Sequence, residues 1–266
     1  MEKPKLNLSK PWLFFLLVFV FSWFFWGIAI LLNQVFMYFP TIIFYILGGF
    51  GPSIIGIILT YLSRDKEEIK DFWHRSRDFK RIHYPWYGAI ITVSLTPHLI
   101  AGGLSILFGG SGIGFDPDFV SNLLFSIIFL IIGVLAEEFG WRGFVLDPLQ
   151  KKYNALTSSM ILGFFWALWH LPLFFINATY QQGLGLFTLD FWMFFIVILP
   201  SSVFYTWIFN NTNRSILSAI LLHFCVNFFG ELFSMNVQVR IISDIFVFIF
   251  AIMVVLIYGY RNLTRA

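Results

Sequence analysis

Eight long apolar stretches constrain the fold of this chain more than any other feature of its sequence. Each is at least as long as the roughly 20 residues that an α-helix needs to cross a membrane. Their residues are apolar on all sides rather than in alternation, which argues against transmembrane β-strands. We therefore predict an all-α, polytopic membrane protein, a bundle of about eight transmembrane helices. The stretches are residues 11–33, 41–63, 85–109, 118–146, 155–176, 187–209, 215–235 and 240–260.

The composition excludes a soluble domain. Of the 266 residues, 59% are hydrophobic and 12% are charged, and the mean hydropathy is +0.82. No internal repeat or low-complexity tract divides the chain, so we expect residues 1–266 to form a single membrane domain. The first stretch is too long for a signal peptide and has no small-residue cleavage site, so we expect it to be retained. The one cysteine, Cys225, cannot form an intrachain disulfide.

Basic residues are distributed unevenly between the two sides of the predicted bundle. If eight helices alternate in direction, 16 of the 17 Lys and Arg residues lie in connections on one side, and Arg240 alone lies on the other. The positive-inside rule therefore places both termini in the cytoplasm, and no nucleic-acid partner is needed to explain the basic charge. The polar connection 64–83 mixes charged and aromatic residues, which is typical of an amphipathic segment at cytoplasmic lipid headgroups. A topological anchor is favoured there over substrate recognition.

Ionisable side chains within the apolar stretches are the functional candidates, because each is costly in lipid. His98 and Glu231 are set aside, the first as a helix-contact residue and the second as an interfacial one. The remaining polar residues fall into three separate stretches. They are Glu137, Glu138 and Arg142 in the segment LAEEFGWRGF, His170, and His223 with Asn227.

Their depths in the bundle are predicted to be comparable. Glu137 lies 10 residues before the cytoplasmic turn 147–154 and His170 lies 16 residues after it. At a rise of ~1.5 Å per residue, these positions are about 15 and 24 Å from the turn. His223 lies 10 residues beyond the next turn, 210–213, or about 15 Å by the same rise. We expect the three helices to meet, with His170 about two helical turns out of level, a gap that tilt or an uneven turn could close.

Local spacing separates the two glutamates. Glu138 and Arg142 have i,i+4 spacing and can pair on one helix face. Glu137 points about 100° away from this face, which leaves it free for another task. A helix end at this point would place carboxylates where the helix dipole disfavours them, so we expect the helix to continue past the arginine. His223 and Asn227 share a face by the same i,i+4 rule.

A glutamate, two histidines and an amide are the parts of a hydrolytic site. The glutamate can take a proton from water, one histidine can orient that water, and the other histidine with the amide can stabilise an oxyanion. Glu137, His170 and His223 would also be the three protein ligands of a catalytic zinc. No HExxH motif is present. The residues therefore leave two alternatives open, a zinc site and a metal-free glutamate mechanism.

These residues resemble the CPBP intramembrane protease family, also called Abi, which includes the type II CAAX prenyl endopeptidases. The family is known by EExxxR, FxxxH and HxxxN motifs, each in its own transmembrane helix. Segment 137–142 reads EEFGWR and segment 223–227 reads HFCVN, which match the first and third motifs. Segment 166–170 reads WALWH, so Trp166 replaces the phenylalanine of the second. We expect this supporting residue to affect local packing more than chemistry, because an aromatic ring is preserved.

The resemblance implies an intramembrane endopeptidase that acts on a membrane-associated protein or peptide of CAAX type, with or without a prenyl group. It implies a prokaryotic plasma-membrane location, with the lipid bilayer as the environment. Zinc and glutamate-activated water both remain open within the family. The implied roles are water activation by Glu137 and His170, oxyanion stabilisation by His223 and Asn227, and structural support by Glu138 and Arg142.

Two other functions are weighed against this one. The first is a non-catalytic membrane protein, a bacteriocin-immunity or partner-binding factor that keeps the polar cluster for structure. The second is a transporter or proton relay, for which intramembrane Glu and His are equally suitable. A relay needs a polar path toward the other side, and the first three stretches contain few polar groups. The relay is therefore ranked last.

Overall fold

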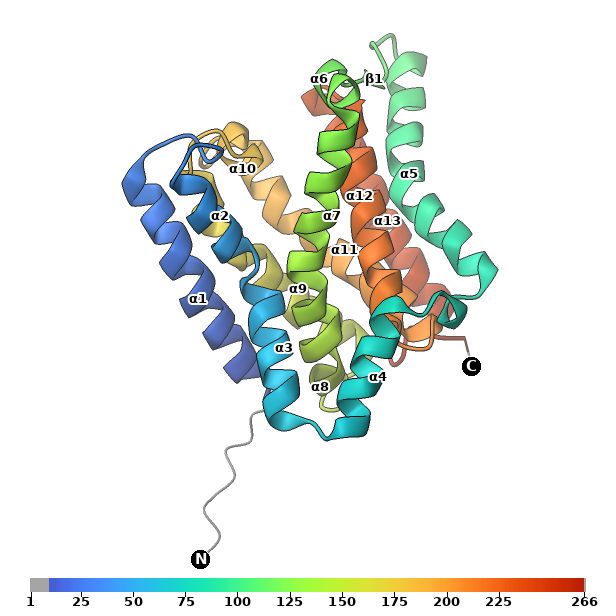
Figure 1. Cartoon of the computed structure of the whole chain (residues 1–266). Coiled ribbons are helices and arrows are strands. Elements are labelled where there is room, and N and C mark those ends of the chain that lie inside the picture. Colours follow the sequence, from blue (N-terminus) through green and yellow to red (C-terminus); the bar gives the residue numbers. More distant parts are fainter. Residues whose placement is uncertain (1–9, 266) are drawn as a thin grey trace, which may run out of the picture.

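The computed structural model describes residues 10–265, which form a bundle of helices (Figure 1). The helices are α1 (Pro11–Leu32), α2 (Thr41–Gly49), α3 (Gly51–Ser63), α4 (Lys66–Arg77), α5 (Tyr84–Leu107), α6 (Pro117–Ser121), α7 (Leu123–Gly140), α8 (Leu146–Gln150), α9 (Ala155–Trp169), α10 (Tyr180–Leu184), α11 (Leu189–Asn211), α12 (Ile216–Leu232) and α13 (Val237–Tyr258). Shorter elements are the 3-10 helices η1 (Phe79–Arg81) and η3 (Leu171–Phe175), the π-helix η2 (Trp141–Val145), and the antiparallel strands β1 (Gly114–Phe115) and β2 (Phe233–Ser234).

The all-α, polytopic membrane fold is confirmed. Within the described residues, six helical segments are long and apolar enough to cross a membrane: α1, α5, α7 continued through α8, α9 continued through η3, α11 and α13. The other two predicted stretches contain a bent pair, α2 with α3, and the shorter apolar helix α12. Each of the eight stretches therefore holds one helical unit, although the second is not a straight span.

The second stretch bends where glycine and proline interrupt it. α2 and α3 meet at Phe50 with an angle of 48° between them. Gly49 and Gly51 flank the bend, and Pro52 occupies the first turn of α3, where a missing N–H costs no helical hydrogen bond. The hydropathy pattern did not distinguish this bend from a straight helix, because both conformations bury the same apolar residues.

Small residues bring α3 against α7, the helix that carries the two glutamates. A Cβ on Gly56 would lie 2.7 Å from the Cα of Gly140, and a Cβ on Gly140 would collide with the carbonyl of Pro52. The hydroxyl of Ser53 donates to the carbonyl of Leu135 at 2.8 Å. The glycines therefore permit a backbone contact that fixes the level of α7 beside α3.

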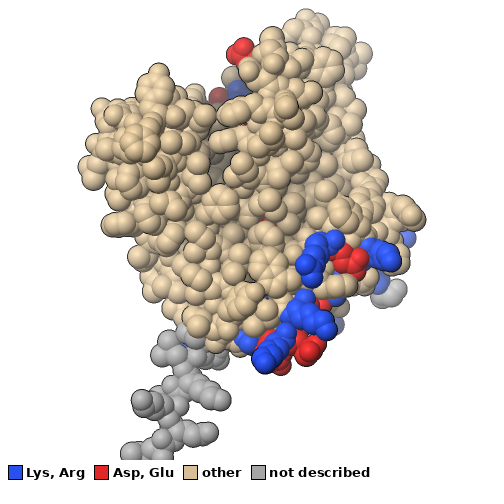
Figure 2. Space-filling model, viewed as in Figure 1, with Lys and Arg blue, Asp and Glu red and all other residues tan. Residues whose placement is uncertain are grey.

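Charge is concentrated at one end of the bundle. In the face shown in Figure 2, charged side chains gather at the end that contains α4, and most of the remaining surface is uncharged. Arg240 lies toward the other end, where it pairs with Asp190 at 3.6 Å. Lys3 and Lys5, which belong to the predicted basic side, lie outside the described residues. The count of basic residues predicts that Arg142 lies in a connection between helices. That prediction is wrong, because Arg142 is fully buried in the helix.

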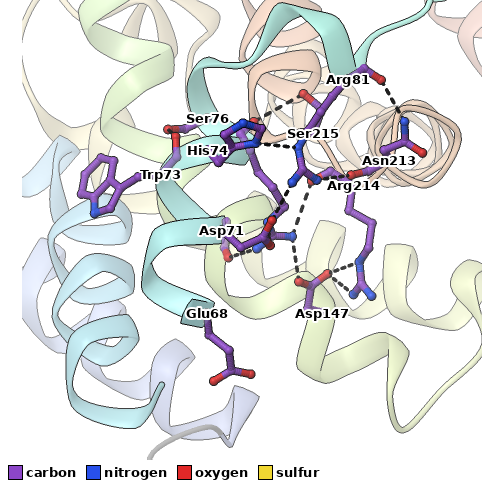
Figure 3. A network of polar contacts seen from close by, with 12 residues as sticks. Glu68, Asp71, Trp73, His74, Ser76, Arg81, Asp147, Asn213, Arg214 and Ser215 are labelled. Carbon is purple, nitrogen blue, oxygen red and sulfur yellow. Dashed lines mark hydrogen bonds and ion pairs between the residues drawn. The ribbon is translucent and has the colours of Figure 1, made fainter. Parts of the chain in front are cut away.

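The amphipathic segment forms helix α4, and a polar network ties it to the bundle (Figure 3). Asp65 and Glu68 form a capping box at its start. The side chain of Arg75 on α4, which is 4% exposed, donates to the carboxylate of Asp147 on α8 at 3.0 Å. Arg214 pairs with the other oxygen of Asp147. Asp147 therefore connects α4, α8 and the loop before α12.

Candidate active site

Glu138 is the centre of a buried ionic cluster. The Nη1 atom of Arg142 donates to both of its oxygens, at 2.9 and 3.2 Å, which confirms the predicted i,i+4 pair. The Nδ1 atom of His223, on α12, lies 2.8 Å from Oε1 of the same carboxylate. Glu138 and Arg142 have no exposed surface, and His223 is 5% exposed. Glu138 therefore holds a histidine as well as the arginine, a second contact that its spacing alone did not indicate.

Aromatic rings enclose the guanidinium of Arg142. Its carbon Cζ lies 4.4 Å from the ring centre of Trp166 and 3.9 Å from that of Tyr205. Its Nε and Nη2 atoms make no hydrogen bond to any residue in the described range 10–265. Cation–π attraction strengthens when water is excluded, so the two rings compensate in part for the missing partners. Removal of Glu138 would leave Arg142 buried without a counter-ion, and removal of Arg142 would leave Glu138 with His223 as its one remaining partner among the described residues.

Glu137 is half-buried and faces a different set of partners. Its Oε2 atom accepts a hydrogen bond from the indole N–H of Trp166 at 2.6 Å and from that of Trp141 at 3.2 Å. Its Oε1 atom accepts none from the part of the chain that the structure describes. Trp166 therefore does more than pack, because a phenylalanine could not donate to this carboxylate; its effect on the chemistry stays a prediction.

His170 lies where α9 tightens into η3. Its backbone N–H bonds to the carbonyl of Ala167 in a 3-10 pattern, which releases the carbonyl of Trp166 from its helical partner. The ring atom Nδ1 of His170 lies 2.8 Å from that carbonyl oxygen. Because a carbonyl only accepts, Nδ1 carries the hydrogen and a neutral ring presents Nε2 as an acceptor. Pro172 follows within η3, where the tighter turn accommodates it.

The histidines and Glu137 meet around Trp166. The Trp166 ring packs edge-on against His223, with 5.4 Å between ring centres, and lies 6.2 Å from the ring of His170. The same indole donates to Glu137, so the carboxylate lies on the ring that packs against both histidines. Three helices that are distant in sequence thus bring one carboxylate and two imidazoles to a single place.

An uneven turn closes most of the gap of two helical turns predicted for His170. The predicted turn spans residues 147–154, but residues 146–150 are the helix α8. From Glu137 to Gln150 the helical path is 13 residues, and from Ala155 to His170 it is 15. The difference corresponds to about 3 Å along a helix rather than about 9 Å. The π-helix η2 continues α7 into α8, so the sequence alone placed the turn too early.

The other polar residues considered from the sequence, Asn227, His98 and Glu231, lie outside the cluster around Trp166. Asn227 is half-buried one turn beyond His223, and its amide makes no hydrogen bond within residues 10–265. Its role stays a prediction. His98 lies 3.0 Å from the hydroxyl of Ser243 on α13, which confirms it as a helix-contact residue. Glu231 is exposed near the end of α12, as expected of an interfacial residue.

Comparison with known proteins identifies the family. A family model described as "Type II CAAX prenyl endopeptidase Rce1-like" matches residues 119–229. CAAX prenyl protease 2 of Methanococcus maripaludis is 33% identical over 259 residues, which cover 93% of this chain and 93% of that protein. The chain belongs to the type II CAAX prenyl endopeptidase family. Membership places it among the integral membrane proteins of the intramembrane protease class, and the matched segment contains all three motifs.

The side chains of this endopeptidase-family member do not converge as a zinc site. Within residues 10–265, no group of three or more His, Cys, Asp or Glu side chains lies close enough to hold a metal ion. The contacts of Glu137 and His223 with the described residues leave Oε1 and Nε2 free, so the donor atoms themselves would suit a metal. The spacing of the groups is what does not fit three protein ligands around one zinc ion. The hydrolysis proposed below therefore has no step through a metal.

Sequence reasoning missed two residues of this endopeptidase-like site, Trp141 and Tyr205. Trp141 stands four residues after Glu137, so its contact with the glutamate could have been found from i,i+4 spacing. Tyr205 is 1% exposed on α11 and packs against both Trp166 and His223. No local signal indicates Tyr205, because its partners lie on other helices.

Proposed function

We propose that this protein is an intramembrane endopeptidase that hydrolyses a peptide bond of a membrane-associated protein or peptide of CAAX type, with or without a prenyl group. The observation that carries the proposal is Glu137, a half-buried carboxylate held through one oxygen by Trp166, whose ring packs against two histidines. The second oxygen is left for water. CAAX prenyl protease 2 of Methanococcus maripaludis, by its name, supports the CAAX-type substrate.

In the proposed reaction, Glu137 accepts a proton from water as the oxygen of that water attacks the scissile carbonyl carbon. His170 assists through Nε2, which accepts a hydrogen bond from the same water while Nδ1 remains bound to the Trp166 carbonyl. The proton then passes to the nitrogen of the leaving amine as the C–N bond breaks. One water is consumed, and a carboxylic acid and an amine are released.

His223 and Asn227 are proposed to stabilise the oxyanion of the tetrahedral intermediate. The Asn227 amide can donate without any change of protonation. His223 binds Glu138 through Nδ1, so it must carry both ring protons to donate from Nε2 as well. Preorganised donors of this kind typically contribute about 100- to 1,000-fold to kcat. Arg142 and Glu138 then support the site by holding His223.

Peptide cleavage by the purified protein tests the function. Prenylated and unprenylated CAAX peptides, and a peptide library, would be incubated with the full chain with and without a chelator. We expect the protein to cleave the peptide at the same rate with and without the chelator. Glu137→Gln and His170→Ala should each lower kcat by about 100- to 10,000-fold, the usual contribution of a general base.

Controls separate inactivity from misfolding. Each variant must match the parent protein in expression and melting temperature. If the folded parent cleaves no peptide, or if both variants keep its biological effect, a non-catalytic immunity or partner-binding role replaces the enzyme. Loss of cleavage with chelator and its return with zinc would instead support a metal mechanism.

The charged end of the bundle is proposed to face the cytoplasm of a prokaryote, with both termini on that side. The support is the uneven distribution of basic residues, which persists after Arg142 is counted as buried. Single cysteines introduced at Lys70 and at Gly109 in a Cys225→Ser background would be labelled from outside intact cells. Labelling at Gly109 and not at Lys70 is expected; the reverse pattern would overturn the orientation.

A further inference from the structure

We infer that Trp166 is a positioning residue that aligns both halves of the water-activating pair, Glu137 and His170. The inference rests on the proposed function and extends it to a residue at which this chain departs from the family pattern. Trp166 contacts Glu137 through its side chain and His170 through its backbone. No other described residue hydrogen-bonds to both.

The side-chain contact fixes the carboxylate of Glu137. The distance from Trp166 Nε1 to Glu137 Oε2 is 2.6 Å, a hydrogen bond from an N–H donor to a carboxylate oxygen. Trp166 is 5% exposed, so water does not readily replace the indole as donor. The bond therefore occupies Oε2 and leaves Oε1 as the oxygen that can accept a proton from water.

The backbone contact fixes the ring of His170. The Trp166 carbonyl lies 2.8 Å from Nδ1 and determines which ring nitrogen carries the hydrogen. Because one residue supplies both contacts, movement of Trp166 changes Glu137 and His170 together. The indole also stacks against the Arg142 guanidinium, with 4.4 Å to the ring centre, which restricts its own rotation. The arrangement gives Trp166 little freedom to move.

The chain offers a clean way to remove the donor alone. Trp166→Phe keeps an aromatic ring, and it is the residue of the family motif, but it cannot donate to Glu137. The backbone carbonyl that holds His170 is unchanged. Trp26→Phe is the matched control, because Trp26 is also a buried tryptophan whose indole donates to a carbonyl, that of Tyr45 at 3.0 Å.

Steady-state cleavage of the CAAX peptide measures the effect. Trp166→Phe should lower kcat by roughly 10- to 100-fold with KM unchanged, because misalignment of a reacting group acts on the chemical step. Trp26→Phe should leave kcat unchanged. A Trp141→Phe variant should give a smaller decrease, since its bond to Glu137 is longer at 3.2 Å. Wild-type kcat in folded Trp166→Phe would overturn the inference.

A spectroscopic measurement tests the contact without activity. In protein labelled with 15N-tryptophan, the indole proton of Trp166 should resonate far downfield, and Trp166→Phe identifies its signal. Glu137→Gln replaces the charged acceptor by a neutral one, so this signal and that of Trp141 should move upfield while the other indole signals stay in place. If neither moves, the inference fails.

The two measurements distinguish the two possible failures. If the parent protein cleaves no peptide but the indole signals move in Glu137→Gln, the proposed function fails while the contact stands. If the parent cleaves and Trp166→Phe cleaves equally well, the positioning role fails while the function stands. Should Trp166→Phe not fold, the Glu137→Gln spectrum still decides whether an indole binds this carboxylate.

Discussion

Two clusters of arginine and carboxylate lie only a few residues apart on the α7 to α8 helix, and their surroundings differ. The inner one joins Glu138, Arg142 and His223, with no exposed surface on the ion pair. The outer one joins Asp147 to Arg75 and Arg214 at the charged end of the bundle (Figure 3). The side chain of Asp147 is 13% exposed and that of Arg214 is 48% exposed.

The difference shows that the same chemical pair serves two purposes. In the inner cluster, aromatic rings replace water, so the charges depend on each other and hold a catalytic candidate in place. In the outer cluster, Asp147 and Arg75 each have more than one charged partner, and water reaches part of the group. Arg75, for example, also contacts Asp71 and the carbonyl of Gly143. The outer cluster therefore fastens helices and tolerates loss of one contact.

The largest effect is expected from loss of the inner arginine. Arg142→Ala leaves Glu138 buried without its cation, which should lower the free energy of unfolding by about 3–5 kcal/mol. Denaturant or SDS unfolding followed by circular dichroism measures this change. The double variant Glu138→Gln, Arg142→Met should recover part of the loss, because no buried charge remains unpaired. A double variant less stable than Arg142→Ala would contradict the account.

A smaller effect is expected at the centre of the outer cluster. Asp147→Asn preserves shape but removes the charge that Arg75 and Arg214 share. We expect the free energy of unfolding to fall by about 1–3 kcal/mol, the cost of weakening hydrogen bonds to charged groups. The same unfolding measurement applies. A loss as large as that of Arg142→Ala would erase the distinction between the two clusters.

Salt should change the stability contributed by the outer cluster more than that contributed by the inner one. Raising the salt concentration from 0.01 to 1 M shortens the Debye length from about 30 to about 3 Å and screens exposed charges far more than buried ones. The destabilisation caused by Asp147→Asn should therefore decrease with salt, while that caused by Arg142→Ala should stay constant. Unfolding of both variants and the parent at the two salt concentrations checks this. Equal salt dependence would be the contrary result.

The smallest effect is expected on the outer surface of α4. Lys70 and Glu67 lie 3.9 Å apart, with side chains 78% and 85% exposed. Lys70→Ala should change the free energy of unfolding by less than about 0.5 kcal/mol, as is usual for an exposed pair. This variant also provides the surface control for Asp147→Asn. A decrease in the free energy of unfolding above about 1 kcal/mol would contradict the view that the Lys70 and Glu67 pair contributes little.

Much of the site could be predicted because its parts are close in sequence. The Glu138 and Arg142 pair follows from i,i+4 spacing, and the unfavourable position of carboxylates at a helix end predicted that the helix continues. The level of His170 could not be predicted, because nothing in the sequence distinguished helix α8 from the turn that follows it. A π-helix depends on the packing around it, here against α3 and α12, rather than on local propensity.

The sequence by itself determined the fold class, because each backbone polar group in a bilayer needs a partner and long apolar stretches satisfy that need as helices. It also determined which residues were candidates, since charge in lipid is costly. Only the tertiary structure decided their partners. Glu137 and Trp166 are separated by 29 positions in the sequence, and Glu138 and His223 by 85. The packing of whole helices brings these partners together, and no local spacing specifies it.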